Sequence, residues 1–189
     1  MNLLTTKKTK QKNKFSTHTL AAMAMSAAVL CISSYISITL PNGSHITFLN
    51  LVITLITLLF PVSQAVCIIS LWLLMGIAGL PVFAGGMAGL GYLCSPWGGY
   101  NIAFLLTAIF IPLLCGKNYH RIRCLTASIT AVIFIDLFGS LWVMMISHLS
   151  FPGALLIGFL PFIALDLIKA VIAAQLVPAF QRIIKIERK

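Results

Sequence analysis

Long apolar stretches, interrupted by short breaks that contain Pro, Gly or charged residues, run along almost the whole chain. Dividing the sequence at these breaks gives six stretches, most of them close to the ~20 residues that a transmembrane helix needs, although the second is short. The pattern predicts an all-α integral membrane protein, a bundle of about six transmembrane helices near residues 18–40, 46–60, 62–80, 98–116, 124–148 and 161–181.

The composition excludes a soluble domain of this length. Of the 189 residues, 60% are hydrophobic and only 8% are charged, a balance that globular domains in water do not show. The nearest approach to a phosphate loop is Gly116-Lys117, but Asn118 follows where Ser or Thr is required. No ATPase or large catalytic module therefore fits in this chain.

All Lys and Arg residues except Lys169 lie in three short blocks rather than along a surface with interleaved aromatic residues, which argues against a nucleic-acid-binding role. With six spans, all three blocks fall on one side of the membrane, and the positive-inside rule then places both termini in the cytoplasm. The blocks are Lys7 to Lys14, then Lys117, Arg121 and Arg123, and finally Arg182, Lys185, Arg188 and Lys189.

These charges also divide the chain. We expect a basic cytoplasmic amino-terminal segment at residues 1–17, a transmembrane domain at 18–182 and a basic cytoplasmic tail at 183–189. The basic start followed by an apolar run is similar to a signal peptide. However, the run from Thr19 to Leu40 is long enough to cross a bilayer, which favours a retained first helix.

Enzyme signatures are not found in the sequence. The single Glu, Glu187, lies in the tail, and no Ser stands in a GxSxG motif. The five Cys form no CxxC pair, and the four His, at 18, 45, 120 and 148, lack metal-ligand spacing. We therefore predict a binding protein that is not an enzyme and has no cofactor and no metal.

Asp166 and Lys169 are three residues apart inside the last apolar stretch, so a helix places their side chains on one face. Each charge costs ~2.5 to 3.5 kcal/mol at the centre of an inserted helix, so the pair needs a compensating role. One interpretation is an intrahelical ion pair. The other is a ligand pocket, in which the ammonium receives an anionic group and the carboxylate accepts from N–H groups.

A second candidate is the uncharged, glycine-rich segment from Gly76 to Tyr100. Its glycines permit tight bends, and its aromatic residues offer flat surfaces to a small molecule, so the segment is typical of a lid over an apolar pocket. The alternatives are an ordinary flexible loop and a GxxxG packing face at Gly85 and Gly89.

Two weaker signals lie in other spans. Ala24 and Ala28 form a stripe of small residues in the first span, where another protein or a neighbouring helix of the chain could approach closely. Asp136 is a further acid in the fifth span, and it could line the same cavity or be a protonated acid bonded to a backbone carbonyl.

Three stretches carry a resemblance to a known family: "GLPVFAGGMAGLGYL", "PWGGY" and "PFIALDLIKAVIAA". In this order and spacing they resemble the signature stretches of the BioY family, the biotin-binding S components of energy-coupling factor transporters, from about Thr19 onward. The resemblance implies a six-helix protein of the bacterial cell membrane that captures biotin from outside. It also implies two kinds of partner, a transmembrane coupling protein, docked on the stripe at Ala24 and Ala28, and two ATP-binding-cassette ATPases.

By the same resemblance, Asp166 and Lys169 contact the ligand, and the glycine-rich segment closes the site through Phe83, Gly85, Gly86 and Tyr100. Biotin suits such a pocket because its ureido ring offers two N–H donors, its valerate tail a carboxylate and its bicycle an apolar surface. The chain departs from the family pattern in "SPWGGY" at 95–100, in "SHIT" at 44–47 and at Asp136.

Three other interpretations are consistent with the sequence. An S component for a different small vitamin would keep the fold and the partners but change the pocket. A membrane-embedded enzyme would use Asp136 or Asp166 as a base and turn over a substrate. A purely structural membrane subunit would bind no ligand.

Overall fold

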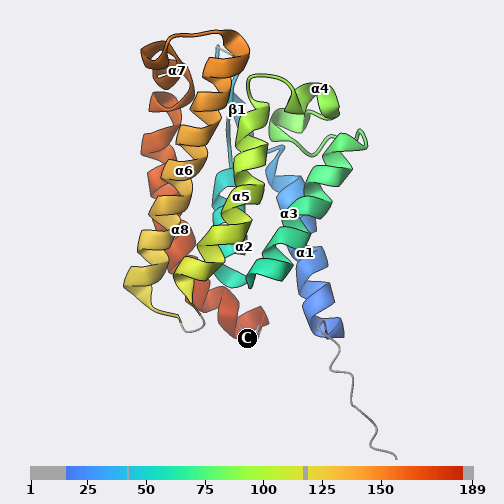
Figure 1. Cartoon of the computed structure of the whole chain (residues 1–189). Coiled ribbons are helices and arrows are strands. Elements are labelled where there is room, and N and C mark those ends of the chain that lie inside the picture. The colour runs from blue at the N-terminus through green and yellow to red at the C-terminus, as the bar shows by residue number, and fades with distance from the viewer. Residues whose placement is uncertain (1–15, 42, 117–118, 185–189) are drawn as a thin grey trace, which may run out of the picture.

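The structure is a computed structural model that describes residues 16–41, 43–116 and 119–184. Six principal helices make a bundle (Figure 1), joined by a β-hairpin and three short helical segments. In chain order the elements are α1 (Thr17–Ser33), β1 (Ser37–Thr39), β2 (His45–Thr47), α2 (Leu49–Leu59), α3 (Val62–Ile77), η1 (Ala84–Gly86), α4 (Leu90–Leu93), α5 (Gly98–Cys115), α6 (Arg121–Ser147), α7 (Phe151–Gly158) and α8 (Leu160–Ile184).

The prediction of one helix over 18–40 is wrong beyond Ser33. The hydroxyls of Ser33 and Ser34 donate to carbonyl oxygens of the last helical turn, Leu30 O and Cys31 O, both at 2.7 Å. The β-branched residues Ile36, Ile38 and Thr39 follow, and such side chains favour a strand. Strand β1 pairs antiparallel with β2. The predicted second span, 46–60, is accordingly divided into strand β2 and helix α2.

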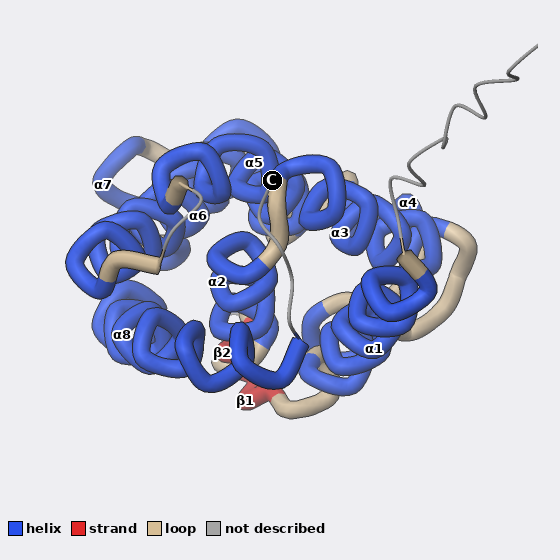
Figure 2. The backbone as a smooth tube through the Cα atoms, turned by 90° about the horizontal axis from the view of Figure 1, so that it is seen from below, coloured by secondary structure: helices blue, strands red, loops and turns tan. Residues whose placement is uncertain are grey.

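Helix α2 is short and lies in the middle of the bundle, encircled by the other principal helices (Figure 2). Its 11 residues extend ~16 Å, about half of a ~30 Å hydrocarbon core. Eight of these residues are buried. The hairpin precedes α2 at the end of the bundle, and its strand β1 is largely exposed, with Ile38 at 68%.

Three of the described helices, α5, α6 and α8, are long and apolar enough to cross a membrane by length and composition. Helices α1 and α3 are shorter, with 17 and 16 residues, and are also apolar. The outward faces carry large apolar side chains, among them Met25 at 70% exposure and Leu113 at 68%. Such faces are suited to lipid rather than to water.

The start of α1, the connection between α5 and α6 and the end of α8 lie at one end of the bundle (Figure 1). Arg121 and Arg123 stand in the first turn of α6, and Arg182 stands in the last turn of α8, so the described arginines gather at that end. The hairpin, α4 and α7 lie at the opposite end. The predicted basic segment, residues 1–17, and the tail, 183–189, fall mostly outside the described residues.

The glycine-rich segment is packed onto the bundle. Phe83 is fully buried, with its ring 5.4 Å edge-on from Trp72 and stacked 5.4 Å from Tyr92. The indole N–H of Trp72 donates to Val82 O at 2.9 Å. These contacts fix the segment against α3, so an ordinary flexible loop does not describe it.

Candidate functional site

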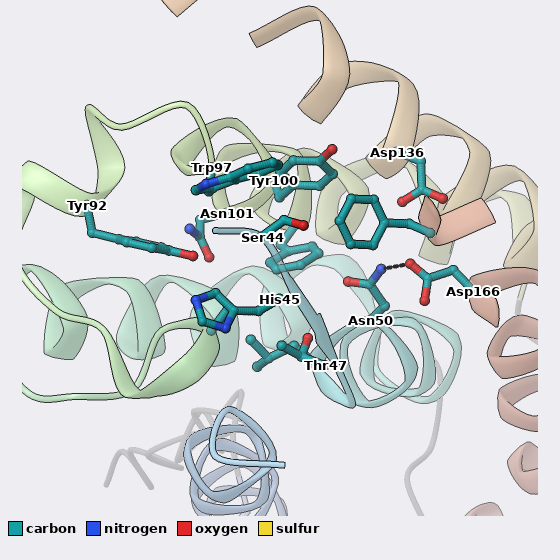
Figure 3. A pocket seen from close by; sticks show the side chains of 14 residues that line it. Ser44, His45, Thr47, Asn50, Tyr92, Trp97, Tyr100, Asn101, Asp136 and Asp166 are labelled. Atoms are coloured by element: carbon teal, nitrogen blue, oxygen red, sulfur yellow. Dashed lines mark hydrogen bonds between the residues drawn. The ribbon is translucent and has the colours of Figure 1, made fainter. Parts of the chain in front are cut away.

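A cavity opens among the hairpin, the glycine-rich segment and four principal helices (Figure 3). It encloses about 480 Å³ of space free of protein atoms, a volume that includes its open mouth. The lining residues combine aromatic and polar side chains: Ser44, His45, Thr47, Leu49, Asn50, Ala84, Tyr92, Trp97, Tyr100, Asn101, Phe104, Asp136, Phe162 and Asp166.

The carboxylate of Asp166, from α8, is held at one side of this cavity with only 1% of the residue exposed. The ammonium of Lys169 lies 2.6 Å from Oδ1, and the side-chain amide of Asn50 in α2 donates to Oδ2. Lys169 also donates to the backbone oxygen of Thr47 at 2.8 Å. The lysine therefore joins the end of β2 to α8 and fixes the carboxylate in place.

Asp136 approaches the same region from α6 (Figure 3). Its side chain lines the cavity and is completely buried, next to the carboxyl group of Asp166. Among the described residues, no N–H or hydroxyl group donates to its oxygens, and the carboxyl group of Asp166 lies within hydrogen-bonding reach. We call the group of Asn50, Asp136 and Asp166 the acidic end of the cavity.

The other side of the cavity carries neutral polar groups: His45, Tyr92 and Asn101, with Ser44 and Trp97 beside them (Figure 3). Burial raises the pKa of the Tyr92 hydroxyl to about 12, and burial lowers the pKa of the His45 imidazole. Both groups are therefore held uncharged near neutral pH. Because each can donate a hydrogen bond, we call this side the donor end.

Tyr100 forms the wall between the two ends. Its hydroxyl donates to the backbone oxygen of Gly158, and its ring lies 5.9 Å from Phe162 and 6.3 Å from Trp97. Gly139 in α6 leaves the space for this ring, since a Cβ there would lie 2.3 Å from Cε1 of Tyr100. An apolar surface for a small molecule thus joins two polar ends.

Of the residues predicted from sequence, Asp166 and Tyr100 line the cavity. Lys169 is not a lining residue, but its ammonium is paired with the carboxylate of Asp166. Phe83 is not among the lining residues and lies in the core, where it packs on Trp72 and on Tyr92. Gly85 and Gly86 are not among the lining residues, although their neighbour Ala84 is.

Gly85 instead holds the glycine-rich segment against the hairpin. Its N–H donates to Ser34 O at 3.1 Å, and its φ of 70° lies in the left-handed region. A Cβ at this position would lie 2.5 Å from Cε1 of His45, whose ring lines the cavity. Glycine therefore allows the segment to approach the donor end closely.

Several lining residues were not predicted. Asn50 and Asn101 are carboxamides within apolar spans, and that isolation is a signal that could have pointed to them. His45 and Trp97 belong to "SHIT" and "SPWGGY", the stretches that depart from the family pattern. The fold brings both departures and Asp136 to the same cavity, with His45 and Trp97 on the donor side and Asp136 at the acidic end.

Ala24 and Ala28 are exposed on the outer face of α1, while Ala22, Met23 and Ala27 face the bundle. The two predicted docking residues are thus not used for contact with neighbouring helices of this chain. They present two small apolar side chains on the outside, next to the exposed Met25 and Val29.

The comparisons with known proteins point in one direction. The sequence profile of the BioY family matches residues 7–186. The biotin transporter BioY2 of Lactococcus lactis subsp. cremoris is 30% identical over 157 residues, which cover 82% of this chain and 85% of that protein. The probable biotin transporter BioY of Pyrococcus horikoshii is 36% identical over 108 residues, covering 57% and 62%.

A solved structure is similar in fold. The S-component for biotin from an ECF-type ABC transporter superposes with a TM-score of 0.79 at 25% sequence identity. The alignment covers 86% of this chain and 90% of that one. The likeness thus extends over most of the chain.

Proposed function

Because this chain belongs to the BioY family, we propose that it is the biotin-binding S component of an energy-coupling factor transporter. The observation that carries the proposal is the fixed carboxylate of Asp166 in a buried, partly aromatic cavity. A carboxylate that is already oriented can accept N–H groups of a ligand without further ordering, which favours tight binding.

The two ends of the cavity suggest how biotin lies. The ureido ring, with its two N–H donors, is placed at the acidic end against Asp166. The valerate carboxylate is placed at the donor end, near His45, Tyr92 and Asn101. Lys169 then acts by holding Asp166 rather than by receiving the carboxylate, because its ammonium is already engaged with Asp166 and Thr47.

The bicycle of biotin rests between the ends. Tyr100 and Phe162 form an edge-to-face pair there, and Trp97 tilts over the Tyr100 ring. Phe83 stacks on Tyr92 and Gly85 packs closely against His45, so both support the donor end, while Gly86 lies next to Tyr35. Aromatic faces of this kind suit an apolar, sulfur-containing ring system.

The partners follow from the same assignment. We place the coupling protein on the exposed strip at Ala24 and Ala28, where small side chains allow another helix to approach. Two ATP-binding-cassette ATPases supply the energy. We place the protein in a bacterial cell membrane. One end of the bundle, which carries Arg121, Arg123 and Arg182, faces the cytoplasm, and the cavity opens to the outside of the cell.

Equilibrium binding of biotin to the purified protein in detergent tests this function. We expect wild type to bind biotin and Asp166→Ala to lose about 100-fold or more in affinity, because a charge-assisted hydrogen bond is lost. Arg121→Ala, an exposed change at the other end of the bundle, is the control and should bind as wild type does. Binding of another vitamin in place of biotin would contradict the substrate, and the absence of any ligand would contradict the transport role.

A further inference from the structure

Asp136 differs from every other polar group at the acidic end. The oxygens of Asp166 are bonded to Lys169 and Asn50, and the ammonium of Lys169 is bonded to Asp166 and Thr47. Asp136 is fully buried and lines the cavity, yet no N–H or hydroxyl group among the described residues donates to its oxygens, and the polar group within hydrogen-bonding reach is the carboxyl group of Asp166. Buried polar groups are normally satisfied, and two carboxyl groups can share a hydrogen bond only when one of them carries a proton.

The surroundings determine the charge that Asp136 can carry. Its titratable neighbours among the described residues are Asp166 and Lys169 on α8 and Tyr100 on α5, while α2 and α7 contribute none. One ammonium thus faces two carboxyl groups, and it is bonded to Asp166. A second carboxylate without hydrogen bonds would add an unbalanced charge to an apolar interior, and a bound proton removes that cost.

We propose that Asp136 is a ligand-contacting, specificity-determining residue whose neutral carboxyl group offers one O–H donor and one C=O acceptor to a bound molecule. The inference rests on the proposed function, since it assigns to the same cavity the group that recognises the ureido carbonyl. A neutral acid beside the Asp166 carboxylate presents a donor next to an acceptor. A cyclic urea presents the complementary arrangement, a carbonyl acceptor flanked by N–H donors.

This assignment has a specificity consequence. An analogue in which a guanidinium replaces the urea, such as 2-iminobiotin, has no carbonyl to accept from Asp136 and carries a positive charge. A neutral Asp136 selects against it, because a donor would face a cation and an acceptor would be lost. An ionised Asp136 would favour it, because two carboxylates would then face one guanidinium.

The experiment measures the affinities of biotin and 2-iminobiotin for the full-length protein in detergent. Three variants are compared with wild type: Asp136→Asn, which keeps a neutral donor and acceptor, Asp136→Leu, which removes both, and Leu137→Ala, a half-exposed neighbour outside the cavity. Thermal unfolding is followed for each variant to check that it is folded. We expect a loss of biotin affinity of only about 3-fold for Asn but about 30- to 100-fold for Leu.

Wild type should also prefer biotin to 2-iminobiotin, and Leu137→Ala should match wild type. Equal losses of biotin affinity for Asp136→Asn and Asp136→Leu would overturn the proposal that the carboxyl group of Asp136 is neutral. Tighter binding of 2-iminobiotin than of biotin by wild type would overturn it as well. Unchanged binding by a folded Leu variant would overturn the ligand contact while leaving the proposed function in place. If wild type binds no biotin, the proposed function itself fails, and the inference falls with it.

Infrared difference spectroscopy gives a readout that does not depend on affinity. A protonated carboxyl group shows a C=O stretch that is separate from the bands of carboxylates. We expect this band in the wild-type protein, a shift of the band when biotin is added, and its loss in Asp136→Asn. A band that persists in Asp136→Asn would show that the proton lies elsewhere and would overturn the assignment.

Discussion

At the scale of single residues, the charged groups of the cavity have hydrogen-bonding or ion-pair partners, and burial keeps other titratable groups neutral. Asp166 is stabilised by Lys169 at 2.6 Å and by Asn50, so its carboxylate is tolerated where an isolated one would be costly. His45 and Tyr92 are kept uncharged by burial. The orientation of each group, rather than the total charge, sets what the cavity can bind.

Replacing Lys169 with Met should weaken biotin binding about 10- to 100-fold, because Asp166 would lose the cation that stabilises its charge and its position. Lys169→Arg keeps the charge and should recover part of the affinity. The measurement is equilibrium binding of biotin to each purified variant. Equal affinities for wild type and Lys169→Met would contradict the positioning role.

Replacing Tyr92 with Phe should weaken binding by about 5- to 10-fold through the loss of one donor to the valerate carboxylate. Since the pKa of this hydroxyl is raised to about 12, the donor remains protonated throughout the neutral and mildly alkaline range. The ratio of the two affinities should therefore be the same at about pH 7 and about pH 9.5. A ratio that falls toward one at the higher pH would show that the hydroxyl titrates earlier.

At the scale of elements, the site depends on close approaches between segments that glycine permits. Gly85 brings the glycine-rich segment onto His45, and Gly139 brings α6 onto the ring of Tyr100. The hairpin then supplies three lining residues, Ser44, His45 and Thr47, to a cavity otherwise built by helices.

Gly85→Ala should reduce both stability and biotin affinity, because a Cβ there would lie 2.5 Å from the His45 ring. Gly79→Ala is the control, since Gly79 also has a positive φ, 99°, but a Cβ there meets nothing within 4 Å. Both variants carry backbone strain, and only Gly85→Ala adds a steric overlap. Thermal unfolding and biotin binding should therefore be impaired more by Gly85→Ala, and equal effects would contradict the role of the close approach.

The sequence predicted most of the elements and part of the site for identifiable reasons. Long apolar stretches indicate α5, α6 and α8 well, and the charges of Asp166 and Lys169 stand out against an apolar background. The hairpin was not predicted, because strands as short as "SIT" and "HIT" show too little periodicity to be told from helix. Asn50 was missed because its importance lies in a contact with Asp166, 116 residues away.

At the scale of the whole molecule, the binding site and the proposed docking strip are on separate parts of the bundle. The cavity lies among α2, α5, α6 and α8, whereas Ala24 and Ala28 lie on the outer face of α1. Helix α1 packs on α2 and α3, and its residues do not line the cavity. Changes on that outer face should consequently leave ligand binding intact.

Replacing Ala24 and Ala28 together with Leu should leave biotin affinity at the wild-type value but reduce biotin uptake by cells at least about 10-fold, since bulky side chains keep a partner helix at a distance. Val29→Leu, at a 51% exposed position of the same helix, is the control and should leave uptake near normal. The measurements are binding to purified protein and uptake of labelled biotin. Normal uptake by the double variant would contradict docking at this strip.

The contacts of α8 have a consequence for biosynthesis. Asp166 meets Asn50 across 116 residues, and Lys169 meets Thr47 across 122. The ribosome makes α8 last, so the early hairpin and α2 enter the membrane long before the side chains that complete their polar contacts exist. A nascent chain that stops before α8 leaves Asn50 and the Thr47 carbonyl without these partners, and only a finished chain can hold the vitamin.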